Sequence, residues 1–444
     1  MTTSWVNKLV SKTQALLLRK PLTFYTNALY IWLNNIAIAL LALVFWIGAA
    51  RGFSTEHMGL ATATISVIIL LARFSFLGLG MTLVRFLPES KDSNIKLINF
   101  SMLVGGAAAL VASIIFLAGL PIWSPALQFL WSRPLYIVLL PLFTVGVCVS
   151  ALQDQVFVGL RKPVYLLMKN GVVAVGRIAL VWSLVAFQQS FTIVASYSVP
   201  VLLGFVLVVG WLLPRIMPSY KPSLTGQSSL PSGITSFTLT NHAVFLLLYA
   251  PSSLLPIILI NTTGPDAAAY FFVAWSITTP IVAVGGSLAM SLLAEGSADS
   301  SSLYSHLKGG LVTGSTIVGI GLVGLMVLPQ LPLLLFGQAY AEQAIQLVRV
   351  LAVATIPSVL LNIYIATAQV QKRLTGMLIF AGVIFSVSCF GGYFLSLQIG
   401  AMGAALAWLL SQIIGAAYAG IQLRKARVRS PGILDSQGRE NRAS

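Results

Sequence analysis

The chain consists of long apolar runs, each about 20 residues in length, that are separated by short connections. Of its 444 residues, 57% are hydrophobic and only 8% are charged. Because an α-helix rises about 1.5 Å per residue, roughly 20 apolar residues match the hydrocarbon thickness of a bilayer. This pattern predicts an all-α polytopic membrane protein and argues against a soluble domain.

Counting the apolar runs predicts about twelve transmembrane helices, with boundaries good to a few residues. The predicted spans are residues 27–49, 60–83, 98–119, 135–158, 165–186, 192–213, 236–260, 267–293, 309–330, 345–369, 376–396 and 402–422. The first run is too long for a cleaved signal, so we expect residues 1–26 to form a cytoplasmic N-terminal segment.

The basic residues are distributed very unevenly between the two sides of the predicted membrane. Twenty of the 26 Lys and Arg residues fall in the N-terminal segment, the even-numbered connections or the C-terminal tail. Only Arg51, Arg133 and Arg349 fall on the opposite side. By the positive-inside rule, this asymmetry places both termini in the cytoplasm. The net charge of +16 therefore indicates topology and not nucleic-acid binding.

A polar connection at residues 214–235, rich in Ser, Pro and Gly, divides the predicted spans into two groups of six. We therefore predict an N-terminal bundle at 27–213, a C-terminal bundle at 236–422 and a basic cytoplasmic tail at 423–444. The halves share weak similarity, since FYTNALY and TLTNHAV each place a Thr-Asn pair at the start of the first helix of a half. Two repeated six-helix bundles around a central cavity are a transporter architecture.

Apart from Arg349 at the end of the tenth span, three cations lie inside predicted spans, namely Arg73, Lys169 and Arg177. A central Arg costs about 2.5 to 3.5 kcal/mol on insertion scales, so such residues usually serve a function or have a partner. We expect Arg73 and Arg177 to bind a diphosphate in a cavity, with Lys169 as a further candidate. The alternatives are pairing with backbone carbonyls or Asp154, and snorkelling of Lys169 to the interface.

Polar side chains also mark the first helix of each half. Asn27, Tyr30 and Asn34 form a stripe at helical spacing, and Asn241 and His242 open the seventh helix. Each group is a candidate for contacting sugar hydroxyls, with hydrogen bonding to a neighbouring helix as the alternative.

Other motifs carry no chemistry that we would assign. Cys148 and Cys389 have no metal or disulfide spacing, and GIGLVG at 319–324 lies inside an apolar span with no strand before it. We predict no catalytic residue, no metal site and no cofactor.

Three segments resemble the bacterial oligosaccharide flippases, the polysaccharide-transporter branch of the multidrug, oligosaccharidyl-lipid and polysaccharide exporter superfamily. These segments are EHMGLATATISVIILLARFSFLGLGMTLVRFLPE, ALQDQVFVGLRKPVYLLMKN and FGQAYAEQAIQLVRVLAVATIPSVLLNIYIATAQVQKR. The resemblance implies two V-shaped six-helix bundles that move an undecaprenyl-diphosphate-linked oligosaccharide from the inner to the outer leaflet. Lipid II flippases in this superfamily carry fourteen spans, so twelve spans argue against that cargo.

Three functions remain open at this point. The first is a flippase for surface polysaccharides in the bacterial inner membrane, with membrane lipids and a polysaccharide polymerase of the same pathway as further candidate partners. The second is a cation-coupled multidrug or small-solute exporter of the same fold, although residues 27–49 contain no acidic residue. The third, a membrane enzyme of the same pathway, lacks a large outside loop for catalytic groups. For ion coupling, Asp154 is the candidate.

Overall fold

The computed structural model describes residues 22–88, 94–223, 234–296, 316, 318–370 and 374–428. Within these ranges every regular element is a helix. The elements up to the polar connection are α2 (Leu22–Gly52), α3 (Thr55–Phe74), α4 (Leu79–Phe86), α5 (Asn94–Ala118), α6 (Leu120–Trp123), η1 (Pro125–Trp131), α7 (Pro134–Gly159), α8 (Pro163–Ser183), α9 (Ser190–Leu207), η2 (Val208–Leu212) and α10 (Leu213–Ile216). Those after it are α11 (Ile234–Thr262), α12 (Pro265–Gly296), α14 (Gln330–Phe336), α15 (Gln338–Gln343), α16 (Ile345–Val353), α17 (Thr355–Val370), α18 (Leu374–Ile399) and α19 (Ala401–Val428).

The predicted fold class is confirmed, since ten helices of the described chain are long and apolar enough to cross a membrane. An eleventh crossing is made if the bent pair of segments at 318–327 and 330–336 counts as one. The predicted eighth span, 267–293, falls within the 32 residues of α12. The predicted ninth span, 309–330, lies partly outside the described residues.

The predicted second span, 60–83, differs most from expectation because it is not one continuous helix. Helix α3 starts at Thr55, where the Ser54 side chain accepts a hydrogen bond from the His57 backbone N–H, and it ends at Phe74. A turn follows in which Leu77 and Gly78 have positive φ angles of 47° and 77°. This left-handed backbone cannot continue an α-helix, so α4 starts afresh at Leu79. Arg73 therefore sits at a helix break and not in mid-helix.

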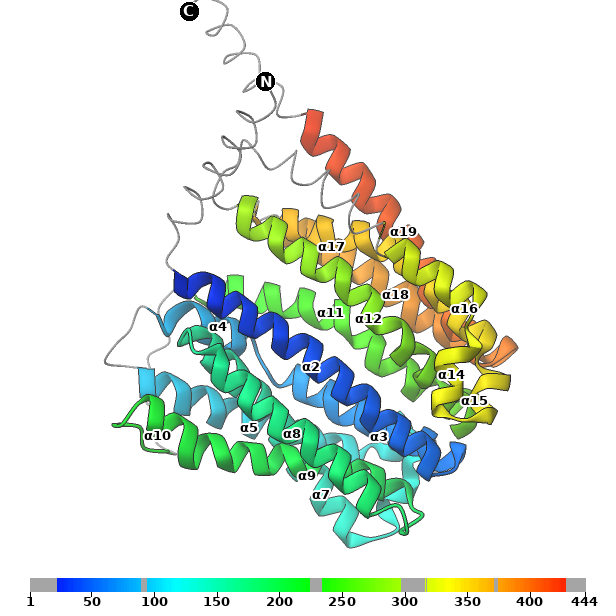
Figure 1. The fold of residues 1–444 in the computed structure, drawn as a ribbon, viewed down its shortest axis with the longest axis horizontal. Coiled ribbons are helices and arrows are strands. Elements are labelled where there is room, and N and C mark those ends of the chain that lie inside the picture. The colour runs from blue at the N-terminus through cyan, green and yellow to red at the C-terminus, as the bar shows by residue number, and fades with distance from the viewer. Residues whose placement is uncertain are drawn as a thin grey trace, which may run out of the picture.

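The helices gather into two groups that follow the order of the chain (Figure 1). In the first group α2 packs on α8, α5 packs on α7, and α8 packs on α9. In the second group α18 packs on α19, α11 packs on α18, and α12 packs on α17. The boundaries predicted for two bundles and a linker stay a prediction, because residues 224–233 lie outside the described part of the chain.

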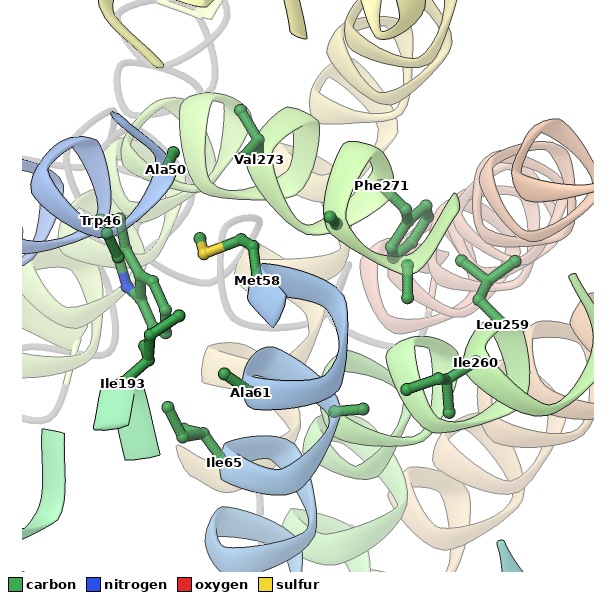
Figure 2. Close-up of a cluster of buried hydrophobic side chains, with 14 of the residues drawn as sticks. Trp46, Ala50, Met58, Ala61, Ile65, Ile193, Leu259, Ile260, Phe271 and Val273 are labelled. Atoms are coloured by element: carbon green, nitrogen blue, oxygen red, sulfur yellow. The ribbon is translucent and has the colours of Figure 1, made fainter. Parts of the chain in front are cut away.

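Helix α3 joins the two groups, because it packs on both α11 and α12 of the second half. Side chains of α2, α3, α9, α11 and α12 meet in one buried cluster that includes Trp46, Met58, Ile193, Leu259 and Phe271 (Figure 2). Small residues dominate the buried surface of α3, including Ala61 and Ala63. Small side chains let helix backbones approach closely, which explains why this helix can pack on both sides.

Candidate functional site

Arg73 lies on the seam between the two halves. Its Nη1 donates hydrogen bonds to the Tyr249 carbonyl oxygen and to Ser252 Oγ, both at 3.3 Å. Its guanidinium carbon lies 5.5 Å from the centroid of the Tyr249 ring. Both partners belong to α11, so these contacts join the half-buried Arg73 side chain to the second half.

Arg177 lies on α8 and contacts Tyr197 of α9 in two ways. Its Nε donates to the Tyr197 carbonyl oxygen at 2.9 Å, and its guanidinium carbon lies 3.7 Å above the centroid of the Tyr197 ring. The Tyr197 side chain is also within electrostatic range of Arg73, whose own hydrogen bonds and ring contact go to α11. We call Arg73, Arg177, Tyr197 and Tyr249 the arginine cluster.

The arginine cluster has no carboxylate partner among the described residues. Among the described residues one ion pair is found, and it joins Lys169 to Asp154 outside the cluster. The hydrogen-bond acceptors of both arginines are carbonyl and hydroxyl oxygens, which leave the positive charges uncompensated. Two intramembrane guanidinium groups in this state can form charge-assisted, bidentate hydrogen bonds with an anion.

Lys169 has a different environment from the arginines. Its Nζ is fully buried and donates to the Ser150 carbonyl oxygen at 2.9 Å, to Ser150 Oγ at 2.8 Å and to Asp154 Oδ1 at 2.5 Å. An ammonium group has three donors, so all of them are occupied. Pairing with Asp154, one of the alternatives that the sequence left open, is what the structure shows. Neither substrate binding by Lys169 nor ion coupling by Asp154 is tested by this pairing.

A chain of polar side chains connects this ion pair to the first helix. Asn170 hydrogen-bonds the Asp154 side chain, and its Nδ2 donates to Asn34 Oδ1 at 3.2 Å. Asn34 is thus buried against α8 in the first half. Tyr30 is half-buried on the same helix, while the side chain of Asn27 lies outside the described residues.

His242 of α11 reaches the helix break in the second span. Its Nε2 lies 3.2 Å from the Phe74 carbonyl oxygen, a group that the end of α3 leaves without an intrahelical partner. Asn241 precedes it on the same helix. The contact joins the first half of helix α11 to the end of α3, at the residue that follows Arg73.

The two halves also meet at the opposite end, which we call the distal end and define by Arg51, Thr55 and Asp266. Arg51 Nε and Nη2 donate to the carbonyl oxygens of Leu335 and Leu334 at 2.6 and 3.0 Å. Thr55 Oγ1 donates to Asp266 Oδ1. These bonds connect α2 and α3 of the first half to α14 and α12 of the second.

A further distal contact involves Asn261. Its Nδ2 donates to Ser124 Oγ at 2.8 Å, and its Oδ1 accepts from the Ala126 backbone N–H at 3.1 Å. This second-half side chain is therefore anchored to the segment that precedes α7. Together with the bonds of Arg51 and Thr55, it joins the two halves at the distal end.

Sequence reasoning missed the aromatic partners of the arginines and the role of Arg51. Tyr197 and Tyr249 look like ordinary aromatic residues of apolar spans, so no sequence signal marks them. Arg51 was counted only as a topology signal. Asn170, by contrast, is a polar residue within a span and could have been identified. In the described chain, no group of three His, Cys, Asp or Glu side chains could hold a metal ion.

The sequence profile of the polysaccharide biosynthesis protein family matches residues 24–293, more than half of the chain. The chain belongs to the polysaccharide biosynthesis protein family. No curated protein sequence matches it. Membership confirms the resemblance drawn from the three sequence segments.

Solved structures of the MOP superfamily share the fold of this family member. The lipid II flippase MurJ in an inward closed conformation has a TM-score of 0.68 at 13% identity, covering 90% of this chain and 87% of MurJ. An inward-facing MATE-family multidrug resistance transporter gives 0.61 at 15% identity, covering 88% and 96%. A MOP-superfamily transporter from Pyrococcus furiosus, described as having a binding pocket of reverse polarity, gives 0.60 at 14% identity, covering 90% and 95%. The chain is thus a multi-pass membrane protein with the fold of MOP-superfamily transporters and flippases.

Proposed function

We propose that the protein is a flippase that moves an undecaprenyl-diphosphate-linked oligosaccharide from the inner to the outer leaflet of the bacterial cytoplasmic membrane. It would act by alternating access in surface polysaccharide biosynthesis, with both termini in the cytoplasm. The arginine cluster carries this proposal, because neither guanidinium group has a carboxylate partner among the described residues, and Arg73 lies between the halves.

The charge of the cluster favours a diphosphate over the alternative cargo. A diphosphate diester carries about two negative charges, and planar guanidinium groups hold phosphate oxygens in a bidentate manner. A cation-coupled exporter of cationic drugs would place positive substrates beside these arginines. In addition, Asp154, the candidate for cation coupling, is already neutralised by Lys169. The family and the MurJ-like fold agree with a lipid-linked cargo.

In the same proposal, polar residues on the first helix of each half contact the sugar. Asn27, Tyr30 and Asn34 on α2 and Asn241 and His242 on α11 are the candidates. Of these, Asn34 and His242 already hydrogen-bond neighbouring helices in this conformation, so they would reach the cargo only after those bonds break.

The proposal is tested by replacing Arg73 in a complemented deletion strain and measuring surface polysaccharide at equal protein abundance. We expect Arg73→Met to abolish export, Arg73→Lys to retain part of it and Arg73→Glu to be inactive. Losing one charge-assisted contact costs about 1.5 to 3 kcal/mol, which weakens binding by roughly 10- to 150-fold. Purified Arg73→Met should therefore bind undecaprenyl diphosphate correspondingly more weakly than wild type.

Arg215 provides a matched control. It also places its guanidinium carbon 5.5 Å from an aromatic centroid, that of Trp211, but it is exposed near the end of α10. Arg215→Met should leave both export and lipid binding intact. Full export by a well-expressed Arg73→Met protein would refute the diphosphate role of the cluster.

A further inference from the structure

A row of aromatic contacts leads from Arg177 to the second half of the protein. The Tyr197 ring, which lies under the Arg177 guanidinium, stacks with Trp46 of α2 at a centroid distance of 6.0 Å and an interplanar angle of 29°. Trp46 in turn packs edge-on against Phe272 of α12 at 4.5 Å. We call Arg177, Tyr197, Trp46 and Phe272 the aromatic relay.

The aromatic relay ends at a contact that holds the halves together. Trp46 is only 8% exposed, and it meets α12 of the second half through Phe272. Arg51, which bonds the carbonyl oxygens of α14, lies five residues further along the same helix α2. Trp46 and the Arg51 contact therefore lie on the same part of α2, and Figure 2 shows the Trp46 indole beside Ile193 of α9.

We propose that Tyr197 is a positioning residue that couples anion binding at the arginine cluster to opening of the distal end. A bound diphosphate competes with the Tyr197 carbonyl oxygen for the Arg177 Nε–H and draws the guanidinium away from the Tyr197 ring, because a charged acceptor binds an N–H more strongly than a neutral carbonyl oxygen does. Once Arg177 turns to the anion, the Tyr197 ring loses its cation and moves. Trp46 then loses its stacking partner, which weakens its contact with Phe272 and loosens the distal closure.

This inference rests on the proposed function, since it takes the ligand to be the diphosphate head group. It predicts a change in anion affinity that a purely structural role of Tyr197 would not produce. If wild type must break the Arg177–Tyr197 ring contact in order to bind, a variant without that ring does not carry this cost. Tyr197→Leu should then bind the anion at least as tightly as wild type, while distal opening no longer responds to binding.

The experiment measures the distance between spin labels at the distal end, with undecaprenyl diphosphate in nanodiscs as the ligand. Exposed Glu56 on α3 and exposed Glu342 on α15 are replaced by Cys for labelling, in a background of Cys148→Ala and Cys389→Ala. In the wild-type relay, the lipid should shift the distances to longer values. In Tyr197→Leu the shift should be lost although the lipid binds, and Tyr197→Phe, which keeps the ring, should retain it.

Tyr136→Leu is the matched control, because it removes a tyrosine that stacks on Phe191 at 3.9 Å within the first half and outside the relay. It should respond to the lipid as wild type does. The inference is overturned if wild type binds the lipid without a distance change, if Tyr197→Leu still opens, or if Tyr197→Leu loses affinity. Failure of wild type to bind undecaprenyl diphosphate at all would instead overturn the proposed head-group recognition, and the relay with it.

Discussion

Gly59 permits the closest backbone contact between the two halves. A Cβ atom at this position would overlap the Pro265 carbonyl oxygen and would lie 2.5 Å from its carbonyl carbon and 2.8 Å from its Cα. Ordinary Cβ contacts lie at 3.4 to 4 Å. Because the obstructing atoms are backbone, no side-chain rotamer change can relieve the overlap. Gly59→Ala therefore forces α3 and the start of α12 apart by roughly 1 Å or more.

The magnitude follows from the cost of overpacking, which is typically 1 to 3 kcal/mol and sometimes more. Taking about 3 kcal/mol for a backbone obstruction, the ratio of closed to open distal ends falls about 150-fold. Moving an equilibrium from 99:1 to 1:99 needs about 5.5 kcal/mol, so about 3 kcal/mol covers roughly half of that range. A protein that starts at 99 closed molecules to one open molecule would therefore end with about equal numbers of each. We expect Gly59→Ala to be open in about half of the molecules without any ligand.

Spin labels at positions 56 and 342 measure this population directly. In Gly59→Ala they should show a second, longer distance that exceeds the local displacement of about 1 Å, and export should fall. Gly171→Ala is the matched control, because a Cβ at this α8 position meets nothing within 4 Å. A Gly59→Ala protein that is stably folded, shows only the wild-type distance and exports normally would refute the reasoning.

Three further predictions concern topology, the buried ion pair and the driving force. A Cys at position 162 should escape impermeant reagents applied outside intact cells, because the loop at Arg161 and Lys162 is predicted to be cytoplasmic; its modification would contradict the orientation. Lys169→Met should destabilise the protein by up to about 3 kcal/mol in thermal unfolding, because it leaves the partly buried Asp154 carboxylate unpaired, and adding Asp154→Asn should restore much of this loss. Export should slow when the membrane potential collapses, since two outward-moving negative charges gain about 4.6 kcal/mol at 100 mV. If export by the Asp154→Asn, Lys169→Met double variant depends on ion gradients as wild-type export does, Asp154 has no coupling role.

Much of the fold could be predicted because a membrane span leaves a simple signal. About 20 apolar residues between short basic connections are enough to locate most helices, and the structure places a helix or part of one in each predicted range. The break after Phe74 could not be predicted, since it depends on a left-handed turn at Leu77 and Gly78 that the sequence LGLG permits but does not require. The dual packing of α3 is equally invisible, because it is a property of contacts distant in the chain.

The sequence is enough to predict the cations of the candidate site, but it does not predict the side chains and carbonyl groups that contact them. Sequence hydropathy identifies Arg73, Lys169 and Arg177 as buried in spans, because charge in an apolar run is conspicuous. Which of them is neutralised depends on the direction in which each side chain points. Lys169 and Arg177 lie on one helix, yet one faces α7 and the other α9. Tyr249 lies 176 residues beyond Arg73, so only the folded chain brings them together.

The balance of charge within the spans gives the strongest argument for an anionic cargo. Of the 26 basic residues, twenty are predicted to mark the cytoplasmic side and Arg51, Arg133 and Arg349 the opposite side, which leaves Arg73, Lys169 and Arg177 deep within predicted spans. The Asp154 carboxylate neutralises Lys169, the cation that is fully buried in the first half. The two arginines have no carboxylate partner among the described residues, and their two positive charges match the roughly two negative charges of a diphosphate diester. A cationic drug would add repulsion at the same place, so a diphosphate is the ligand that this arrangement of charges favours.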